Sequence, residues 1–341
     1  MPHHARQPRD IPLGDIPRPG VPRSRPAATP RRSATPDDLL AISWRLEPRD
    51  YVLAHLVDQH RFLTTDQIAA ILYRSPRTCR NRLNVLRRIG FVDWFMPVHP
   101  TAGRLPVHWV PGPLSARYVA LYHDRPAPSS RAIREARDRY ASAATRLGHL
   151  AHSDGTNQFF IDLLTHARHH PQARLTRWWS AGRTYATVDH NTRPDGHGVW
   201  CDGDQQVAFF LEHDTGTMSH PARAAKLAGY RTLWDKGPQW PVLFWLPTST
   251  IETNLHQHLT NRAAGGTRGV LVATAARDHA ADHGGPAGPV WKVVGNGRRR
   301  LRLAELPGPV GDGGAYHPGP PRPDEDPLYL LRDDAPQEPA D

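Results

Sequence analysis

The segment from residue 48 to residue 90 constrains the fold most, because the sequence itself marks where its helices begin and end. Thr64 begins a capping-box pattern ahead of an apolar stretch, so a helix is expected there. Ser75 followed by Pro76 is a strong start for the next helix, and Gly90 stands where a helix commonly ends. Together with an amphipathic stretch just before Thr64, the segment predicts three consecutive helices.

Two strands are expected after these helices. Residues 91–96 and 107–110 have the composition of strands, and Gly103 and Arg104 lie in the tip between them. Three helices followed by such a hairpin are the order of a winged helix-turn-helix. The sequence therefore predicts this module over residues 45–125.

The third helix has an apolar face and an opposite face of arginine and asparagine. These side chains pair bidentately with guanine and adenine edges, and arginine also binds phosphate. We therefore expect double-stranded DNA as a partner; a solvated Arg-rich face and a protein-binding winged helix stay open as alternatives. With Arg82 and Arg87 flanking them, the residues expected to contact DNA are Arg74, Arg77, Arg80, Asn81, Asn84 and Arg88, and from the hairpin tip Arg104.

The charge balance agrees with a nucleic-acid partner but does not establish one. The 341 residues hold 43 Lys+Arg against 33 Asp+Glu, a formal net charge of +10, and only Lys226, Lys236 and Lys292 are lysines. Such an arginine bias is typical of GC-rich genomes, so the placement of the cations counts for more than their number. No apolar run reaches the roughly 18 residues of a membrane span, and two cysteines make no disulfide framework. A cytoplasmic protein without a membrane segment is expected.

Composition divides the chain into five parts. Residues 1–44 scatter arginines among prolines and are expected to be a disordered basic arm. Residues 307–341 are rich in Pro, Gly and acids and are expected to be a disordered acidic tail. Between the winged helix and a second domain at 149–306, residues 126–148 are expected to form a helical linker.

The second domain is predicted to follow the order helix, three strands, helix, strand. This αβββαβ order is the core layout of PD-(D/E)XK nuclease-like, or restriction-endonuclease-like, domains, so the whole chain is expected to be α+β. The expected segments are a helix at 150–167, strands at 175–179, 199–201 and 207–211, a helix at 221–234 and a strand at 242–246, with a further helix at 251–259 and strand at 270–273.

Acidic residues fall where such a domain would use them. Asp195 lies in a Pro-Asp context before one strand, and Glu212 ends the next strand 17 residues later. Asp214 is expected on the same face as Glu212, because side chains alternate along a strand. Carboxylates are the ligands that Mg²⁺ prefers, so Asp195, Glu212 and Asp214 are predicted to hold it. The predicted chemistry is cleavage of a phosphodiester bond, with Lys226 of the following helix positioning the phosphate.

Simpler explanations of each residue stay open. The usual nuclease pattern places lysine two residues after the glutamate, and this chain has Asp214 there. Pro-Asp-Gly is a common turn around Asp195, and Lys226 could be an ordinary helix residue. His152 begins the helix that would flank the acids, but solvated or core histidines are the simpler explanation. The second domain is therefore expected to be either a metal-dependent DNA endonuclease or nickase, or a domain that binds DNA without cutting it.

Five motifs are spaced along the chain: residues 64–90, His152 with Asn157, residues 193–196, residues 210–217, and Lys226-Leu227 with Tyr230. Through these motifs the chain resembles the replication-relaxation family of plasmids and integrated mobile elements, over about residues 45–275. The resemblance implies a role in plasmid replication control or in DNA relaxation and mobilisation, with replication or mobilisation proteins as partners. A non-catalytic transcriptional or copy-number regulator, whose second domain mediates protein contacts, is the alternative.

Overall fold

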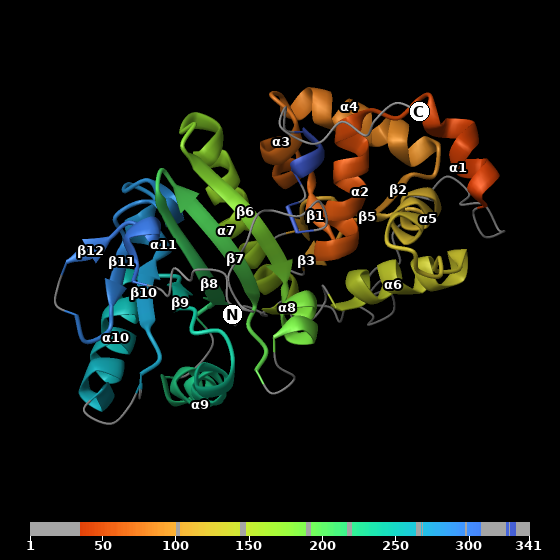
Figure 1. The fold of residues 1–341 in the computed structure, drawn as a ribbon. Coiled ribbons are helices and arrows are strands. Elements are labelled where there is room, and N and C mark those ends of the chain that lie inside the picture. Colours follow the sequence, from red (N-terminus) through yellow and green to blue (C-terminus); the bar gives the residue numbers. More distant parts are fainter. Residues whose placement is uncertain are drawn as a thin grey trace, which may run out of the picture.

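The protein is α+β, with N-terminal helices around a small antiparallel sheet followed by a seven-stranded mixed sheet (Figure 1). The predicted α+β class is therefore confirmed. None of the described helices is long and apolar enough to cross a membrane. The computed structural model describes residues 35–99, 103–143, 148–188, 192–216, 220–263, 267, 269–296, 299–307, 325–326 and 328–331.

The N-terminal helices begin where the sequence marks them. The Thr64 hydroxyl accepts a hydrogen bond from the Gln67 amide at 3.2 Å, and the Gln67 side chain accepts one from the Thr64 amide at 3.0 Å. Ser75 caps the following helix, which has Pro76 at its first position. These helices are α1 (Pro36–Ser43), α2 (Pro48–His60), α3 (Thr65–Leu72) and α4 (Pro76–Arg88).

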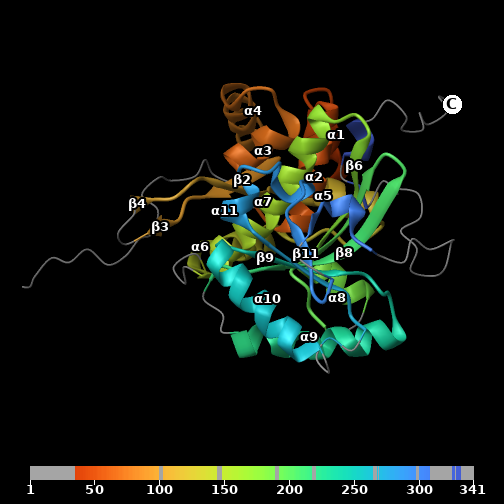
Figure 2. The ribbon, with the colours of Figure 1, turned by 90° about the vertical axis from the view of Figure 1, so that its left-hand side faces the viewer.

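The small sheet follows α4 directly. Gly90 ends that helix with a φ of 82°, in the left-handed region that favours glycine. The strands lie in the order β1 (Leu63–Thr64), β5 (His108–Pro111), β2 (Val92–Phe95), all antiparallel. A hairpin of β3 (Val98–His99) and β4 (Gly103–Arg104) projects from this sheet, as Figure 2 shows. The helices α5 (Pro113–Tyr122) and α6 (Ser130–Ala143) come next in the chain.

The large sheet has the order β12-β11-β10-β9-β8-β7-β6. Strands β8, β9 and β10 are parallel, and the outer pairs are antiparallel. Its strands are β6 (Ala173–Ser180), β7 (Gly196–Asp202), β8 (Gln205–His213), β9 (Val242–Leu246), β10 (Val272–Ala276), β11 (Trp291–Val293) and β12 (Arg300–Leu301). Its helices are α7 (Gly148–His169), α8 (Ala181–Thr187), α9 (His220–Lys236), α10 (Ser249–Ala263) and α11 (Arg277–Ala280).

The two faces of the large sheet are covered by different helices. Phe209 and Leu211 of β8 pack with Phe159 of α7, whereas Phe210, between them, packs with Tyr230 of α9. This alternation places odd-numbered residues of β8 towards α7 and even-numbered residues towards α9. Glu212 therefore lies on the α9 side of the sheet and His213 on the α7 side.

Helix α7 also joins the N-terminal helices to the large sheet. One continuous hydrophobic core contains buried residues of α2, α3 and α4 together with those of α7 and the sheet. Polar contacts cross the same boundary, because the Gln67 side chain donates to the Asp154 carbonyl at 3.1 Å and His108 lies 3.0 Å from the Asp154 carboxylate. The N-terminal helices and the large sheet are therefore packed as one body.

The chain ends are more structured than composition suggests. Helix α1 lies within the predicted disordered arm of residues 1–44, because Thr35 and Asp38 form a reciprocal capping box. Within the predicted disordered tail of residues 307–341, Glu325 is buried and pairs with Arg177 at 2.8 Å. Residues 1–34, 308–324, 327 and 332–341 lie outside the described residues. The domain boundaries at 125 and 148 stay predictions.

Candidate functional site

The pairing of β7 with β8 brings Asp195 beside Glu212. Asp195 directly precedes β7, and its amide donates to the Leu211 carbonyl at 2.9 Å. Its Oδ2 atom accepts a hydrogen bond from the His213 amide at 2.8 Å. Two acids that are 17 residues apart in the sequence therefore lie at one edge of the sheet.

Glu212 is buried, and both of its carboxylate oxygens have a partner. Its Oε2 atom pairs with Lys226 Nζ, and its Oε1 atom accepts a hydrogen bond from the Tyr230 hydroxyl at 2.6 Å. Burial, reinforced by the Asp195 charge, raises the pKa of Glu212 to about 7. Burial lowers the pKa of Lys226, but the charges of Glu212 and Asp195 outweigh burial and leave that pKa raised. Near neutral pH Glu212 is therefore close to the midpoint of its titration, and its protonation depends on the charges around it.

His152 completes the cluster from the first turns of α7. Its Nε2 atom lies 3.1 Å from Asp195 Oδ1, and this hydrogen bond raises the pKa of the imidazole despite burial. Neither His152 nor Tyr230 was among the site residues that the sequence predicted. Both stand in the motifs that carry the family resemblance, which is the signal that could have found them. We call His152, Asp195, Glu212, Lys226 and Tyr230 the polar cluster.

Asp214 lies just beyond the end of β8. The strand ends at His213, and the Asp214 carboxylate accepts a hydrogen bond from the Gly216 amide. Gly216 has a φ of 90°, so the chain turns here and Asp214 stabilises the turn. The expectation that Asp214 shares the face of Glu212 assumed that the strand continues.

The carboxylates of Asp195 and Glu212 contact protein groups in this arrangement of the side chains. Each carboxylate oxygen of Asp195 and Glu212 already accepts a hydrogen bond or lies in an ion pair. Across the residues that the structure describes, no group of three or more His, Cys, Asp or Glu side chains is arranged to hold a metal ion. Mg²⁺ binding by Asp195, Glu212 and Asp214 stays a prediction from the sequence.

The exposed face of α4 is the second candidate site. Its predicted DNA-contacting arginines form no ion pair with any residue that the structure describes, and Arg104 is exposed on β4. Two flanking arginines have internal roles instead: Arg82 pairs with the buried Asp50, and the Arg87 guanidinium lies 5.0 Å from the centre of the Trp94 ring. We call this surface the α4 face; its exposed residues are Arg74, just before the helix, and Arg77, Arg80, Asn81, Asn84 and Arg88 on it.

Fold and sites define an α+β protein with an exposed basic helix face and a partly buried acid–base cluster. A family model described as Replication-relaxation matches residues 54–244, more than half of the chain. The protein therefore belongs to the Replication-relaxation family, which confirms the resemblance. The match runs from α2 to β9 and includes both the α4 face and the polar cluster. No curated protein and no solved structure matches the chain.

Proposed function

We propose that the protein binds double-stranded DNA through the α4 face and the β3–β4 hairpin. In this proposal α3 and α4 are the helix-turn-helix and the hairpin is the wing. The observation that carries the proposal is that four exposed arginines of the α4 face have no acidic partner among the residues that the structure describes, because such cations are available to phosphates. Arg82 and Arg87 differ from these four arginines, because they already contact Asp50 and Trp94.

The chemistry of the α4 face also suits recognition of bases. Asn81 and Asn84 are both exposed and lie three residues apart, so they are neighbours on one side of the helix. Asparagine pairs bidentately with adenine in the major groove, whereas arginine pairs with guanine or phosphate. Arg104 on the hairpin would contact the backbone beside that groove.

We further propose that α7, β6, β7, β8, α9 and β9 form a restriction-endonuclease-like unit. Their order is the predicted αβββαβ, with the short α8 inserted between the first two strands. Because Lys226 and Tyr230 occupy both oxygens of Glu212, the contacts favour a unit that contacts DNA without cutting it. Mg²⁺-dependent nicking is the enzymatic alternative. In either form we expect the protein to act in the cytoplasm on plasmid or mobile-element DNA, with replication or mobilisation proteins as partners.

Binding of the full chain to labelled duplexes tests the first proposal. Arg77→Ala and Arg80→Ala should weaken binding to every duplex, whereas Asn81→Ala and Asn84→Ala should mainly reduce the preference for one sequence over another. Arg299→Ala is the matched control, because the Arg299 side chain is 78% exposed and lies far from α4 in the chain. Equal binding by wild type and the arginine variants would reject the proposed interface.

A further inference from the structure

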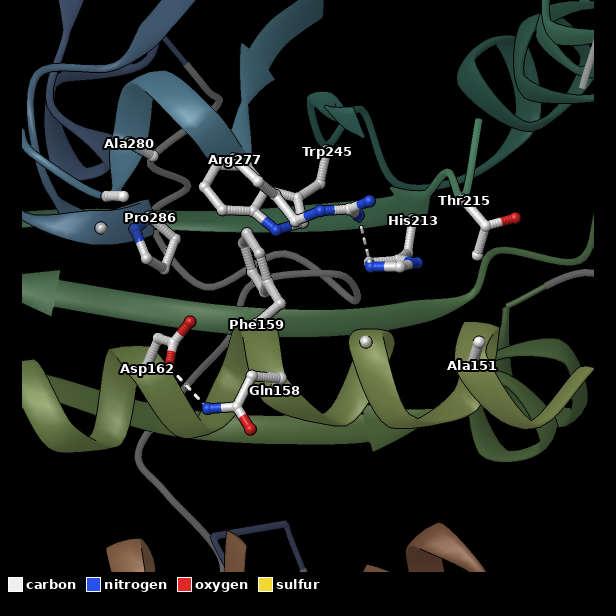
Figure 3. Close-up of a pocket in the computed structure, with 13 residues that line it drawn as sticks. Ala151, Gln158, Phe159, Asp162, His213, Thr215, Trp245, Arg277, Ala280 and Pro286 are labelled. Atoms are coloured by element: carbon white, nitrogen blue, oxygen red, sulfur yellow. Dashed lines mark hydrogen bonds between the residues drawn. The ribbon is translucent and has the colours of Figure 1, made fainter. Parts of the chain in front are cut away.

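A cavity of about 500 Å³ lies on the α7 side of the large sheet (Figure 3). The alternation of side chains along β8 places Glu212 on the other face. His213 and Thr215, at the end of β8, line it beside the polar cluster. One wall is apolar and includes Phe159, Trp245 and Pro286. The volume falls in the range of small-molecule sites and exceeds what a single phosphate ion needs.

Arg277 is a cation in the lining of this cavity, which also includes Asp162. Its Nη1 atom donates to His213 Nε2 at 2.7 Å and to the Asp214 carbonyl at 2.9 Å. Burial lowers the pKa of this guanidinium, and the charge of Asp214 opposes that effect in part. A half-buried cation is stabilised further by an added anion, and the guanidinium fork suits phosphate.

His213 accepts the hydrogen bond from Arg277 in one fixed tautomer. A guanidinium only donates hydrogen bonds, so His213 Nε2 must accept and the ring hydrogen must be on Nδ1. His213 is 5% exposed, and its Nδ1 atom is buried without a partner among the described residues. Burial, followed by the charges of Arg277 and His152, lowers the pKa of His213 to about 3, which keeps this neutral tautomer.

Helix α7 supplies hydrogen-bonding groups on the other side of the cavity, as Figure 3 shows. Gln158 Nε2 donates to Asp162 Oδ1 at 2.7 Å, which leaves one amide hydrogen and one carboxyl oxygen next to each other. A donor beside an acceptor matches the edge of a nucleobase. The lining thus combines an anion-binding end, an apolar wall and a polar edge.

We propose that this cavity binds one nucleotide. The phosphate lies on Arg277, the base lies along the wall of Phe159 and Trp245, and the polar edge of the base meets Gln158 and Asp162. The inference extends the proposed DNA binding, because the nucleotide is either an unpaired unit of a DNA strand at the polar cluster or a free nucleoside phosphate.

Calorimetric titration of the full chain tests this site. The probes are a deoxynucleoside monophosphate, the same deoxynucleoside, inorganic phosphate and a short single-stranded oligonucleotide. We expect the monophosphate or the oligonucleotide to bind, and Arg277→Gln to weaken that binding at least about ten-fold. Arg277→Lys, which keeps the charge without the fork, should bind with intermediate strength. Arg299→Ala should bind like wild type.

A second variant separates loss of the site from loss of the fold. Ala151 lines the cavity and is exposed on α7, so Ala151→Phe should fill the cavity while melting like wild type. Nucleotide affinity that is unchanged in Arg277→Gln and Ala151→Phe would overturn the proposal, as would a deoxynucleoside that binds as tightly as its monophosphate. Binding of the oligonucleotide alone identifies a DNA strand as the source, and binding of the monophosphate alone identifies a free nucleotide.

The two proposals can fail separately. If wild type binds duplex DNA in a salt-dependent manner and binds none of the nucleotide probes, the cavity proposal is wrong and the DNA-binding proposal stands. If nucleotide binding depends on Arg277 but no duplex binds, the cavity proposal stands and the α4 interface is wrong.

Discussion

Replacing Arg77 and Arg80 together by alanine should change how DNA binding depends on salt. Five exposed arginines, four on the α4 face and Arg104 on the hairpin, are each expected to neutralise one phosphate. At about 0.9 per phosphate, the logarithm of the association constant should fall with the logarithm of salt concentration with a slope of about −4.5. Removing two of the five should reduce that slope to about −2.7.

These slopes predict measurable differences in affinity. Between about 50 and about 200 mM salt, wild type should lose about 500-fold in affinity and the double variant about 40-fold. Fluorescence anisotropy of a labelled duplex at several salt concentrations gives both slopes directly. The side chains of Arg77 and Arg80 are exposed, so the double variant should melt at the wild-type temperature.

The control is Arg299→Ala, which removes one cation from the surface while leaving the α4 face intact. It should keep the wild-type slope, because only cations at the interface release counterions. A slope of about −4.5 that persists in the double variant would refute the argument that Arg77 and Arg80 contact phosphates. A flat salt response of the wild type would refute DNA binding by the whole α4 face.

Three further predictions concern the internal contacts. Arg82→Ala should destabilise the protein by about 3 kcal/mol or more, because the Asp50 carboxylate, which is 0% exposed, loses its cation. The control Arg80→Ala should change the free energy of unfolding, measured by urea denaturation, by no more than about 0.5 kcal/mol. Glu212→Gln should stabilise the protein at about pH 8 by about 3 kcal/mol and change little at about pH 4. Folded Glu212, with its pKa raised to about 7, keeps a proton that the unfolded chain has lost. The stability of the wild-type protein from this proton is therefore fully present below the ordinary pKa of 4.5 and is lost as pH rises through about 7. Supercoiled plasmid incubated with Mg²⁺ should stay supercoiled with both wild type and Glu212→Ala, because the Glu212 carboxylate is engaged by Lys226 and Tyr230.

Each of these predictions has a contradicting outcome. Equal stability of the Arg80 and Arg82 variants would show that the ion pair with Asp50 contributes little. A stability difference between wild type and Glu212→Gln that does not vary with pH would show that Glu212 titrates as an ordinary surface acid. Nicking by wild type but not by Glu212→Ala would establish the enzymatic alternative.

The parts of the fold that the sequence predicts well are those whose signals are local. Thr64 and Gln67 bond to each other across one helical turn, and Ser75, Pro76 and Gly90 act on the backbone next to them. Their effects need no knowledge of the rest of the chain. The central strands were predictable for a similar reason, since each is a short apolar run between turns.

The parts that were missed depend on contacts between distant residues. Strand β12 is two residues long, and Arg300 within it is held by the buried Glu252, which is 48 residues away. Nothing in the residues around Arg300 indicates this partner. Glu325 is buried against Arg177 across an even longer separation, so an acidic, proline-rich composition indicated the wrong environment for it. Helix α1 differs, because the Thr35 and Asp38 capping box was a local signal that could have been found.

One part of the candidate site was predictable from the sequence, and another part was not. The approach of Asp195 to Glu212 follows from pairing two consecutive strands, which the sequence indicates. The positions of His152 and Tyr230 depend on which faces of α7 and α9 turn towards the sheet, and that is decided by the packing of both cores. Likewise, helical periodicity alone does not show that Arg82 reaches Asp50 while Arg80 stays in solvent.

The position of α7 has a consequence for how this protein can be divided. A gene fragment that ends before this helix would encode a chain in which apolar side chains of α3 meet water, and in which Gln67 and His108 have lost the partners that Asp154 provides. Such a truncated product should be prone to aggregation, and neither half is expected to be exchangeable with a domain from an unrelated protein. Recombination within this family should therefore preserve the junction between the two halves.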